Sequence, residues 1–311
     1  MTAPLAYVGE LAGLATSAQW ACSAVLWSEA GRYVSSVAVA AVRVLLATPI
    51  LAAIHWAAFG TPWPTDIDSH RLTLLAVSGM IGAGLGDMFL FRALVLVGPR
   101  IATLVLSLAP IVSTLIAYAT LDSDSPGPQA VIGIVLTVAG VVWVVSDPRG
   151  RRNSVDQPGH FAQGVVFTLV SVAAIAVGYV MSRYAMQPRD GGDGVDPFSA
   201  ALVRIAAAAV FISASLPLLR RTKATFLAFG HRKAMLFVVA GTCVGPVGGM
   251  WTSMIALKGA SAGVATALIH TSPVLVMVIS HFAYGEKLSL RTVFGTAVAI
   301  AGVFLLFVGP G

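Results

Sequence analysis

The chain has 311 residues, of which 57% are hydrophobic and only 10% are charged, with a formal net charge of +6 at pH 7 and a mean hydropathy of +0.88. A soluble domain carries about 25% charged residues, so this composition excludes an ordinary soluble enzyme and indicates that lipid surrounds most side chains. We assign the basic excess to membrane topology rather than to nucleic-acid binding, because many of the basic residues lie in short loops.

Apolar segments of helix length follow one another along the whole chain, each close to the roughly 20 residues that a membrane crossing needs. The first half contains predicted spans at Leu5–Trp27, Val34–Phe59, Leu72–Val97, Ile101–Leu121 and Gln129–Val145. The second half contains predicted spans at Phe161–Arg183, Phe198–Leu219, Lys233–Leu257, Ala260–Phe282 and Leu290–Val308. Residues 147–160 are a polar linker between the two sets.

The two halves repeat each other at an offset of 161 to 163 residues. Arg43, Gly82, Gly86, Pro110, Gly133 and Gly140 recur as Arg204, Gly245, Gly249, Pro273, Gly295 and Gly302. Since five crossings is an odd number, the second copy must enter the membrane in the opposite orientation, as in many secondary transporters. We therefore predict an all-α integral membrane protein with ten transmembrane helices, arranged as two inverted five-helix repeats (residues 5–146 and 161–308) around a central cavity.

A pair of arginines at matching positions falls inside predicted spans, where an ionised side chain costs about 2.5–3.5 kcal/mol and needs a partner or a function. Arg43 and Arg204 are repeat mates. One interpretation places them on the cavity, where a guanidinium attracts carboxylates through bidentate hydrogen bonds. The other gives them a structural role in holding the helices together.

Asp87 and His270 break the repeat, because their counterparts are Met250 and Ser107. Asp87 is interpreted as a proton carrier, as a ligand for a substrate amine, or as the partner that neutralises Arg43 or Arg92. His270 lies close to mid-span, and an imidazole titrates near pH ~6.5, within reach of physiological proton gradients. Asp87 and His270 are therefore the candidates for proton coupling, with pairing and packing as their alternative roles.

Pro110 and Pro273 each remove one helical hydrogen bond at matching positions of the repeats. Paired interruptions point to a transporter's binding site, whereas a static kink is the alternative. Trp20, Tyr179 and Trp251 are candidate aromatic walls of the cavity or helix-packing residues. The predicted substrate pathway consists of Trp20, Arg43, Asp87, Pro110, Tyr179, Arg204, Trp251, His270 and Pro273.

Small and aromatic residues add two further expectations. Gly82 and Gly86, like Gly245 and Gly249, have the spacing that lets helix backbones approach closely. We prefer this packing role to phosphate binding, since no strand precedes these glycines. Tryptophans near span ends are expected to anchor the chain at the membrane surface; these are Trp27, Trp56, Trp63 and Trp143.

Several of these stretches resemble the tandem EamA repeats of the drug/metabolite transporter superfamily. In the first half, the resemblance lies in Trp20–Val25 with Arg43 and in Ala93–Pro110. It is clearer in the second half, in Ala256–Pro273, Gly285-Glu286 and the helix with Gly295 and Gly302; the first half has Asp124 where the second has Glu286. The resemblance spans about residues 10–308. It implies a ten-helix fold with a central cavity that exports or imports small metabolites.

The predicted function is a secondary transporter in the plasma membrane that exports a small organic metabolite, such as an amino acid or a drug-like solute, by alternating access. The partners are a small-molecule solute, the lipid bilayer and a coupling proton, with no cofactor, metal or nucleic acid; both monomer and homodimer are left open. An integral-membrane lipid-modifying enzyme is the first alternative, but clustered carboxylates or a Ser/His/Asp set are missing from the spans. An ion channel is the second, although no filter motif is evident.

Two signals for orientation disagree. Four Lys and Arg residues lie on the membrane side of the N-terminus and twelve on the opposite side, which by the positive-inside rule places both termini outside. The family resemblance implies that both termini lie in the cytoplasm.

Overall fold

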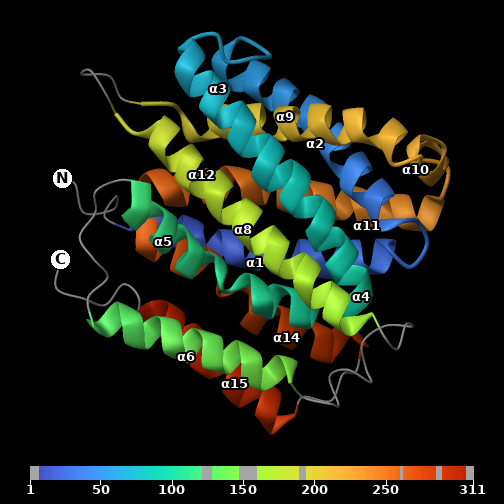
Figure 1. The fold of residues 1–311 in the computed structure, drawn as a ribbon. Helices are drawn as coiled ribbons and strands as arrows, with labels where there is room; N and C mark the ends of the chain where they lie inside the picture. Colours follow the sequence, from blue (N-terminus) through green and yellow to red (C-terminus); the bar gives the residue numbers. More distant parts are fainter. Residues whose placement is uncertain are drawn as a thin grey trace.

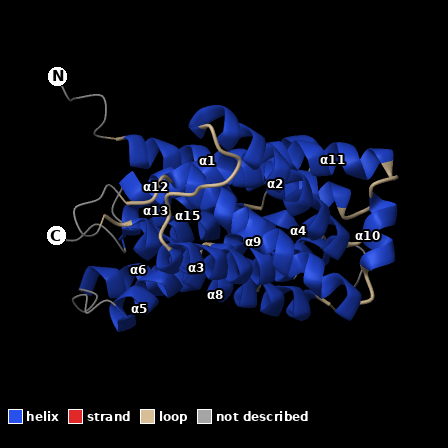
Figure 2. Cartoon of the chain, turned by 90° about the horizontal axis from the view of Figure 1, so that it is seen from above, coloured by secondary structure: helices blue, strands red, loops and turns tan. Residues whose placement is uncertain are grey.

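The structure is a computed structural model that describes residues 7–120, 128–146, 160–188, 194–259, 262–284 and 289–305, and these residues form helices and connections without a β-strand (Figure 2). The first half contains α1 (Val8–Ala30), α2 (Ser36–Phe59), α3 (Ser69–Ser78), the π-helical segment η2 (Gly79–Gly86), α4 (Asp87–Leu106), α5 (Ala109–Thr120) and α6 (Pro128–Val145). The second half contains α8 (Phe161–Met186), α9 (Pro197–Leu218), α10 (Thr222–Ala228), α11 (Arg232–Thr242), the π-helical segment η3 (Cys243–Gly249), α12 (Met250–Gly259), α13 (Ala262–Ile269), α14 (Ser272–Tyr284) and α15 (Leu290–Leu305).

The helices carry the length and composition of a multi-pass membrane protein. Within the described parts of the chain, five helical stretches are long and apolar enough to cross a membrane: Ser36–Phe59, Ser69–Leu106, Phe161–Met186, Pro197–Leu218 and Arg232–Gly259. Three shorter apolar helices are Val131–Val145, Ala265–Ile279 and Leu290–Leu305. Seven of the eight lie over one predicted span each, and Ser69–Leu106 lies over the third and the start of the fourth. Helix α1, which is not among the eight, overlaps the first predicted span from Val8 onward.

Helix contacts recur between the halves with the repeat mates exchanged. The segment η2 packs against α8 and α9, and η3 packs against α1 and α2; α4 packs against α8, and α12 packs against α1. The repeat mates α6 and α15 lie side by side, as do α2 and α9 (Figure 1). A two-fold relation between the halves predicts this exchange, so the two-repeat fold fits the structure.

The two π-helical segments differ from the straight helices expected over Leu72–Val97 and Lys233–Leu257. Gly79 at the start of η2 and Thr242 just before η3 are 163 residues apart, so both segments stand at the same position of the repeat. Their glycines provide the close approach that the sequence indicated. A Cβ on Gly82 would lie 3.5 Å from Cα of Gly178, and one on Gly245 would lie 2.7 Å from Oγ of Ser23. Such π-helical turns are rare in proteins, and those that do occur often lie at functional sites.

Three details were not expected from the sequence. The connection between the third and fourth predicted spans is a kink within α4, where Gly98 adopts φ 78° before Pro99, a backbone conformation that glycine tolerates. The short helix α10 occupies the stretch expected to be a loop. The indole of Trp27, expected at the membrane surface, is only 4% exposed because it fills the space beside Gly241 and Gly245. The other three end tryptophans are exposed.

Candidate functional site

A cavity lies where the two halves meet. Its empty space is about 750 Å³, including the part that continues into solvent. Each half supplies a large share of the lining, from α1, η2 and α4 in the first half and from α8, α9, α12, α13 and α14 in the second. The lining consists of Trp20, Ala24, Trp27, Gly82, Ala83, Asp87, Leu90, Leu94, Thr103, Leu106, Ile175, Tyr179, Arg204, Met250, Ile269, His270 and Ser272.

The helix interruptions predicted around the paired prolines border this cavity. Helix α4 ends at Leu106 and α5 begins at Ala109, while α13 ends at Ile269 and α14 begins at Ser272. Pro110 and Pro273 are each the second residue of the new helix, where a missing N–H costs little. Both prolines are buried and lie outside the lining. The interruptions therefore contribute Leu106, Ile269, His270 and Ser272 rather than the prolines themselves.

Arg204 reaches the cavity from α9 and is 1% exposed. Its Nη1 donates to Oγ of Ser78 at 2.8 Å, to the carbonyl oxygen of Gly178 at 2.8 Å and to Oγ of Ser182. Its guanidinium carbon lies 5.8 Å from the ring centroid of Tyr179. Nε is buried without a hydrogen-bond partner. All three acceptors are formally neutral, so the positive charge of Arg204 has no hydrogen-bonded carboxylate among the described residues.

Arg43, the repeat mate of Arg204, lies outside the lining and forms an ion pair with Asp87. Its Nη2 donates to the Asp87 carboxylate and, at 3.1 Å, to the carbonyl oxygen of Ala83. The guanidinium also lies over the rings of Trp27 and Phe91, 5.2 and 5.0 Å from their centroids. The Asp87 side chain is 12% exposed and lines the cavity. Of the partners considered for Asp87, the structure shows Arg43.

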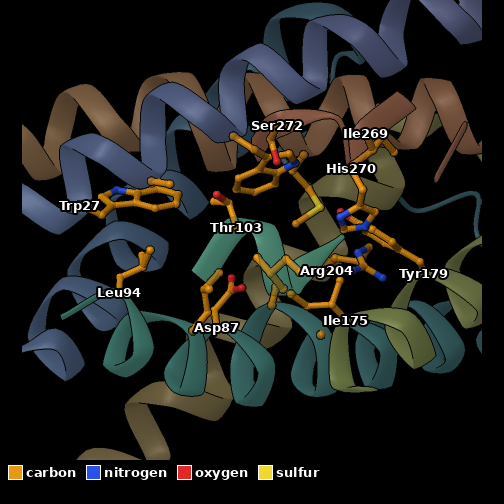
Figure 3. A pocket seen from close by; sticks show the side chains of 17 residues that line it. Trp27, Asp87, Leu94, Thr103, Ile175, Tyr179, Arg204, Ile269, His270 and Ser272 are labelled. Atoms are coloured by element: carbon orange, nitrogen blue, oxygen red, sulfur yellow. The ribbon is translucent and has the colours of Figure 1, made fainter. Parts of the chain in front are cut away.

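His270 and Tyr179 stand near Arg204 at one end of the cavity. Their ring centroids are 6.2 Å apart, and Nε2 of His270 is buried without a partner. Figure 3 shows Arg204, His270 and Tyr179 at one end of the labelled set and Trp27 with Leu94 at the other; Asp87 lies between them in this view. The polar and charged side chains of Arg204 and His270 thus share one end with Ile175 and Ile269, while the labelled residues at the other end are aromatic and aliphatic.

The nine candidate pathway residues divide into two groups. The lining includes Trp20, Asp87, Tyr179, Arg204 and His270. Outside it lie Arg43, Pro110, Trp251 and Pro273. Trp251 is 43% exposed and its ring meets that of Phe198 edge-on at 5.4 Å. Trp251 and Pro273 belong to helices that contribute other lining residues, whereas Arg43 on α2 and Pro110 on α5 do not.

Sequence reasoning did not single out Trp27, Thr103 or Ser272 as lining residues. From the sequence, Trp27 is expected at the membrane surface. The feature that could have indicated its burial is the pair of small residues that face it, Gly241 on α11 and Gly245 on η3. Thr103 has the repeat mate Thr266, so it does not break the repeat as Asp87 and His270 do. Nothing in the sequence therefore distinguishes it from other threonines in the spans. Across the described residues, no group of three or more His, Cys, Asp or Glu side chains is placed to hold a metal ion.

The fold and cavity define an integral membrane protein whose two similar halves enclose a central solute-sized site, the architecture of a membrane transporter. The profile of the EamA-like transporter family matches residues 7–146 and 162–308. The chain therefore belongs to the EamA-like transporter family. No match was found among curated proteins. Among solved structures, one titled only "Crystal structure of protein" is 20% identical, covers 96% of both chains and has a TM-score of 0.64, so it supports the fold.

Proposed function

We propose that this protein is a secondary transporter that exports a small organic metabolite, such as an amino acid or a drug-like solute, across the plasma membrane. In this proposal the chain crosses the membrane ten times, as repeats at residues 5–146 and 161–308 joined by the linker at residues 147–160. The two repeats move relative to each other so that the cavity opens to one side at a time.

The observation that carries the proposal is the position of the cavity. It lies between the halves and is lined from both, so relative motion of the halves changes access to it. The interruptions at residues 107–108 and 270–271 lie on the cavity wall and serve as bending points in this proposal, because most backbone hydrogen bonds there change from the i→i−4 to the i→i−3 pattern. Family membership supports transport over the two rival functions considered from the sequence.

Within this proposal, Asp87 and His270 are the residues for proton coupling. Both line the cavity, and neither has a titratable counterpart in the other repeat. A proton on Asp87 would weaken its attraction to Arg43 and free a donor beside the cavity. His270 has an unpartnered Nε2 that a solute or a proton can occupy. The two residues therefore connect protonation to the state of the cavity.

Flux into proteoliposomes tests the proposal. Purified protein is reconstituted in vesicles, and uptake of a panel of labelled amino acids and other metabolites is measured with and without an imposed pH gradient. We expect saturable flux of a subset of the panel, stimulated by the gradient, and no flux with empty vesicles. If the protein moved no solute of the panel but hydrolysed or modified the vesicle lipid, the proposed function would be wrong.

Orientation is tested separately with reporters fused to the C-terminus. We propose the family's arrangement, with both termini in the cytoplasm. A reporter that is active only outside the cytoplasm should then remain silent. Activity of that reporter would instead support the distribution of basic residues, which places the termini outside.

A further inference from the structure

The buried charges around the cavity do not cancel. The described lining contains one carboxylate, Asp87, and one guanidinium, Arg204. Asp87 already pairs with Arg43, which lies behind it and carries its own positive charge. Two guanidinium groups and one carboxylate leave one positive charge, and it resides on Arg204. A buried ion without a counter-ion is unfavourable unless a ligand supplies the opposite charge.

Arg204, a lining residue, has hydrogen-bonding capacity left. All its hydrogen bonds to the described residues come from Nη1, which leaves Nε buried and without a partner. Nη2 lies beside Gly82, another lining residue, where an added Cβ would approach it to 3.3 Å. Glycine at this position therefore keeps open the space next to the unused guanidinium edge. A planar edge with two N–H groups matches the two oxygens of a carboxylate.

Two other unpartnered polar atoms of the lining fit an acceptor-bearing ligand; a third, Nε1 of Trp27, lies against Gly241. Nε1 of Trp20 is an indole donor that is buried without a partner, and Nε2 of His270 accepts or donates according to its tautomer. The Asp87 carboxylate is the one anionic acceptor on the described lining, and Arg43 occupies it. A cationic ligand would therefore have to compete with Arg43, whereas an anion has an unoccupied partner.

The opposite end of the cavity sets the rest of the ligand. Trp27 and Leu94 lie away from Arg204 in Figure 3, and Leu90 and Leu106 add aliphatic surface to the lining. Resting on the transport function proposed above, we propose that the transported solute is an organic carboxylate, whose anionic group binds Arg204 and whose apolar or aromatic body lies toward Trp27 and Leu94. Arg43 has no direct part in binding, because Asp87 neutralises it and because its unpartnered Nε and Nη1 belong to a fully buried side chain outside the lining.

A matched series of three ligands tests this assignment on the unmodified protein. The probes are 3-phenylpropanoate, 3-phenylpropanamide and 3-phenylpropan-1-amine, which share one aromatic body and differ in charge. Binding is measured by isothermal titration calorimetry with the purified full chain in detergent at pH 7. We expect the carboxylate to bind about ten- to a hundredfold more tightly than the amide, as for one charge-assisted hydrogen-bonded pair, and the amine to bind most weakly.

Variants then assign the preference to Arg204. Arg204→Gln should abolish the difference between carboxylate and amide, and Arg204→Lys, which keeps the charge but loses the planar edge, should retain part of it. The matched control is Arg71→Gln, which removes the same single positive charge from an arginine that pairs with Asp68 and lies outside the cavity lining. It should keep the preference for the carboxylate. If Arg204→Gln fails to fold, the ligand series on the unmodified protein still decides.

Three results would overturn the inference: tighter binding of the amine, equal binding of carboxylate and amide, or no binding of any probe. Loss of the anion preference in Arg71→Gln would assign the preference to the overall charge of the protein rather than to Arg204 and would equally contradict it. The flux measurement is independent. If the protein binds the carboxylate but transports nothing, the transport function fails and the anion site stands; if it transports solutes but prefers the amine, the reverse holds.

Discussion

Arg43 and Arg204 occupy equivalent positions in the two repeats, and both are almost completely buried, yet different partners surround them. Arg43 is neutralised by the carboxylate of Asp87. Arg204 is held by the neutral oxygens of Ser78, Gly178 and Ser182. A duplicated scaffold has therefore kept the arginine in both halves while its electrostatic environment has become different in each.

The difference follows from which residues face each arginine. The counterpart of Asp87 is Met250, so α12 offers no carboxylate to Arg204. On the other side, Trp27 covers the guanidinium of Arg43 with an aromatic ring. Both guanidinium groups keep unpartnered nitrogens, but among the described residues only Arg43 has a carboxylate partner, and only Arg204 lines the cavity. Repeat symmetry shapes the helices, and side-chain asymmetry shapes the chemistry.

The largest effect is expected from breaking the ion pair on one side. Asp87→Asn leaves the Arg43 charge buried without a counter-ion, and we expect the free energy of unfolding in detergent to fall by about 3–5 kcal/mol. Adding Arg43→Gln to Asp87→Asn should restore much of the loss. Asp68→Asn, at an exposed helix cap where asparagine also caps, is the control and should change stability little. Additive losses in the double variant would show that the pair is not coupled.

A somewhat smaller loss of stability is expected from a substitution at Gly79, because the two halves differ in the space available for a side chain at this position. Its counterpart Thr242 already carries a buried side chain, but a Cβ on Gly79 would come 2.7 Å from Cα of Arg204 and still closer to its carbonyl oxygen. Because backbone atoms have to shift, Gly79→Ala should lower the free energy of unfolding by about 1–3 kcal/mol. Gly230→Ala is the control, since its Cβ meets only an ordinary contact at 3.5 Å. Equal melting temperatures for the two variants would contradict this.

Removing one neutral acceptor of Arg204 should have a smaller effect than removing the carboxylate of Arg43. Ser182→Ala leaves Nη1 with Ser78 and Gly178, so we expect a loss of about 1 kcal/mol in the free energy of unfolding. The double variant Ser78→Ala with Ser182→Ala should lose more than the sum of the single variants, because one acceptor substitutes for the other. Thr73→Ala, whose exposed hydroxyl bonds within its own helix, serves as the control. A Ser182→Ala loss as large as that of Asp87→Asn would remove the distinction between the two arginines.

The sequence predicts the helical membrane architecture well because apolar length and repeated landmarks are long-range signals that survive local detail. Interruptions at the paired prolines follow from a missing N–H, a property of the residue itself. The π-helical segments did not follow, because they depend on how closely η2 and η3 approach α8 and α1. Whether such a segment forms a regular α-helix or a π-helical turn depends on the helices that pack against it.

Individual site residues were harder to place because the sequence does not show which way a side chain turns. Asp87 and His270 drew attention as breaks in the repeat, and both line the cavity. Trp27 resembled any tryptophan near the end of a span, and only the glycines that face it account for its burial. Trp251 resembled Trp20 in depth, yet its ring packs on Phe198 outside the lining. Depth in a span is a property of the sequence, but the facing direction depends on packing.

The smallest change in stability is expected from a substitution at His270 that gives this position the same residue as its counterpart in the first repeat. Its counterpart is Ser107, so His270→Ser gives both interruptions the same residue. We expect a change of less than about 1 kcal/mol in the free energy of unfolding, since the lost ring contact with Tyr179 is offset by removal of an unpartnered Nε2. Gradient-stimulated flux should fall strongly while counterflow without a gradient persists, as expected if His270 carries the coupling proton. His281→Ser, at an exposed position, is the matched control. Gradient stimulation equal to that of the unmodified protein would assign His270 to packing, and the asymmetry between the repeats would then rest on Arg43, Asp87 and Arg204 alone.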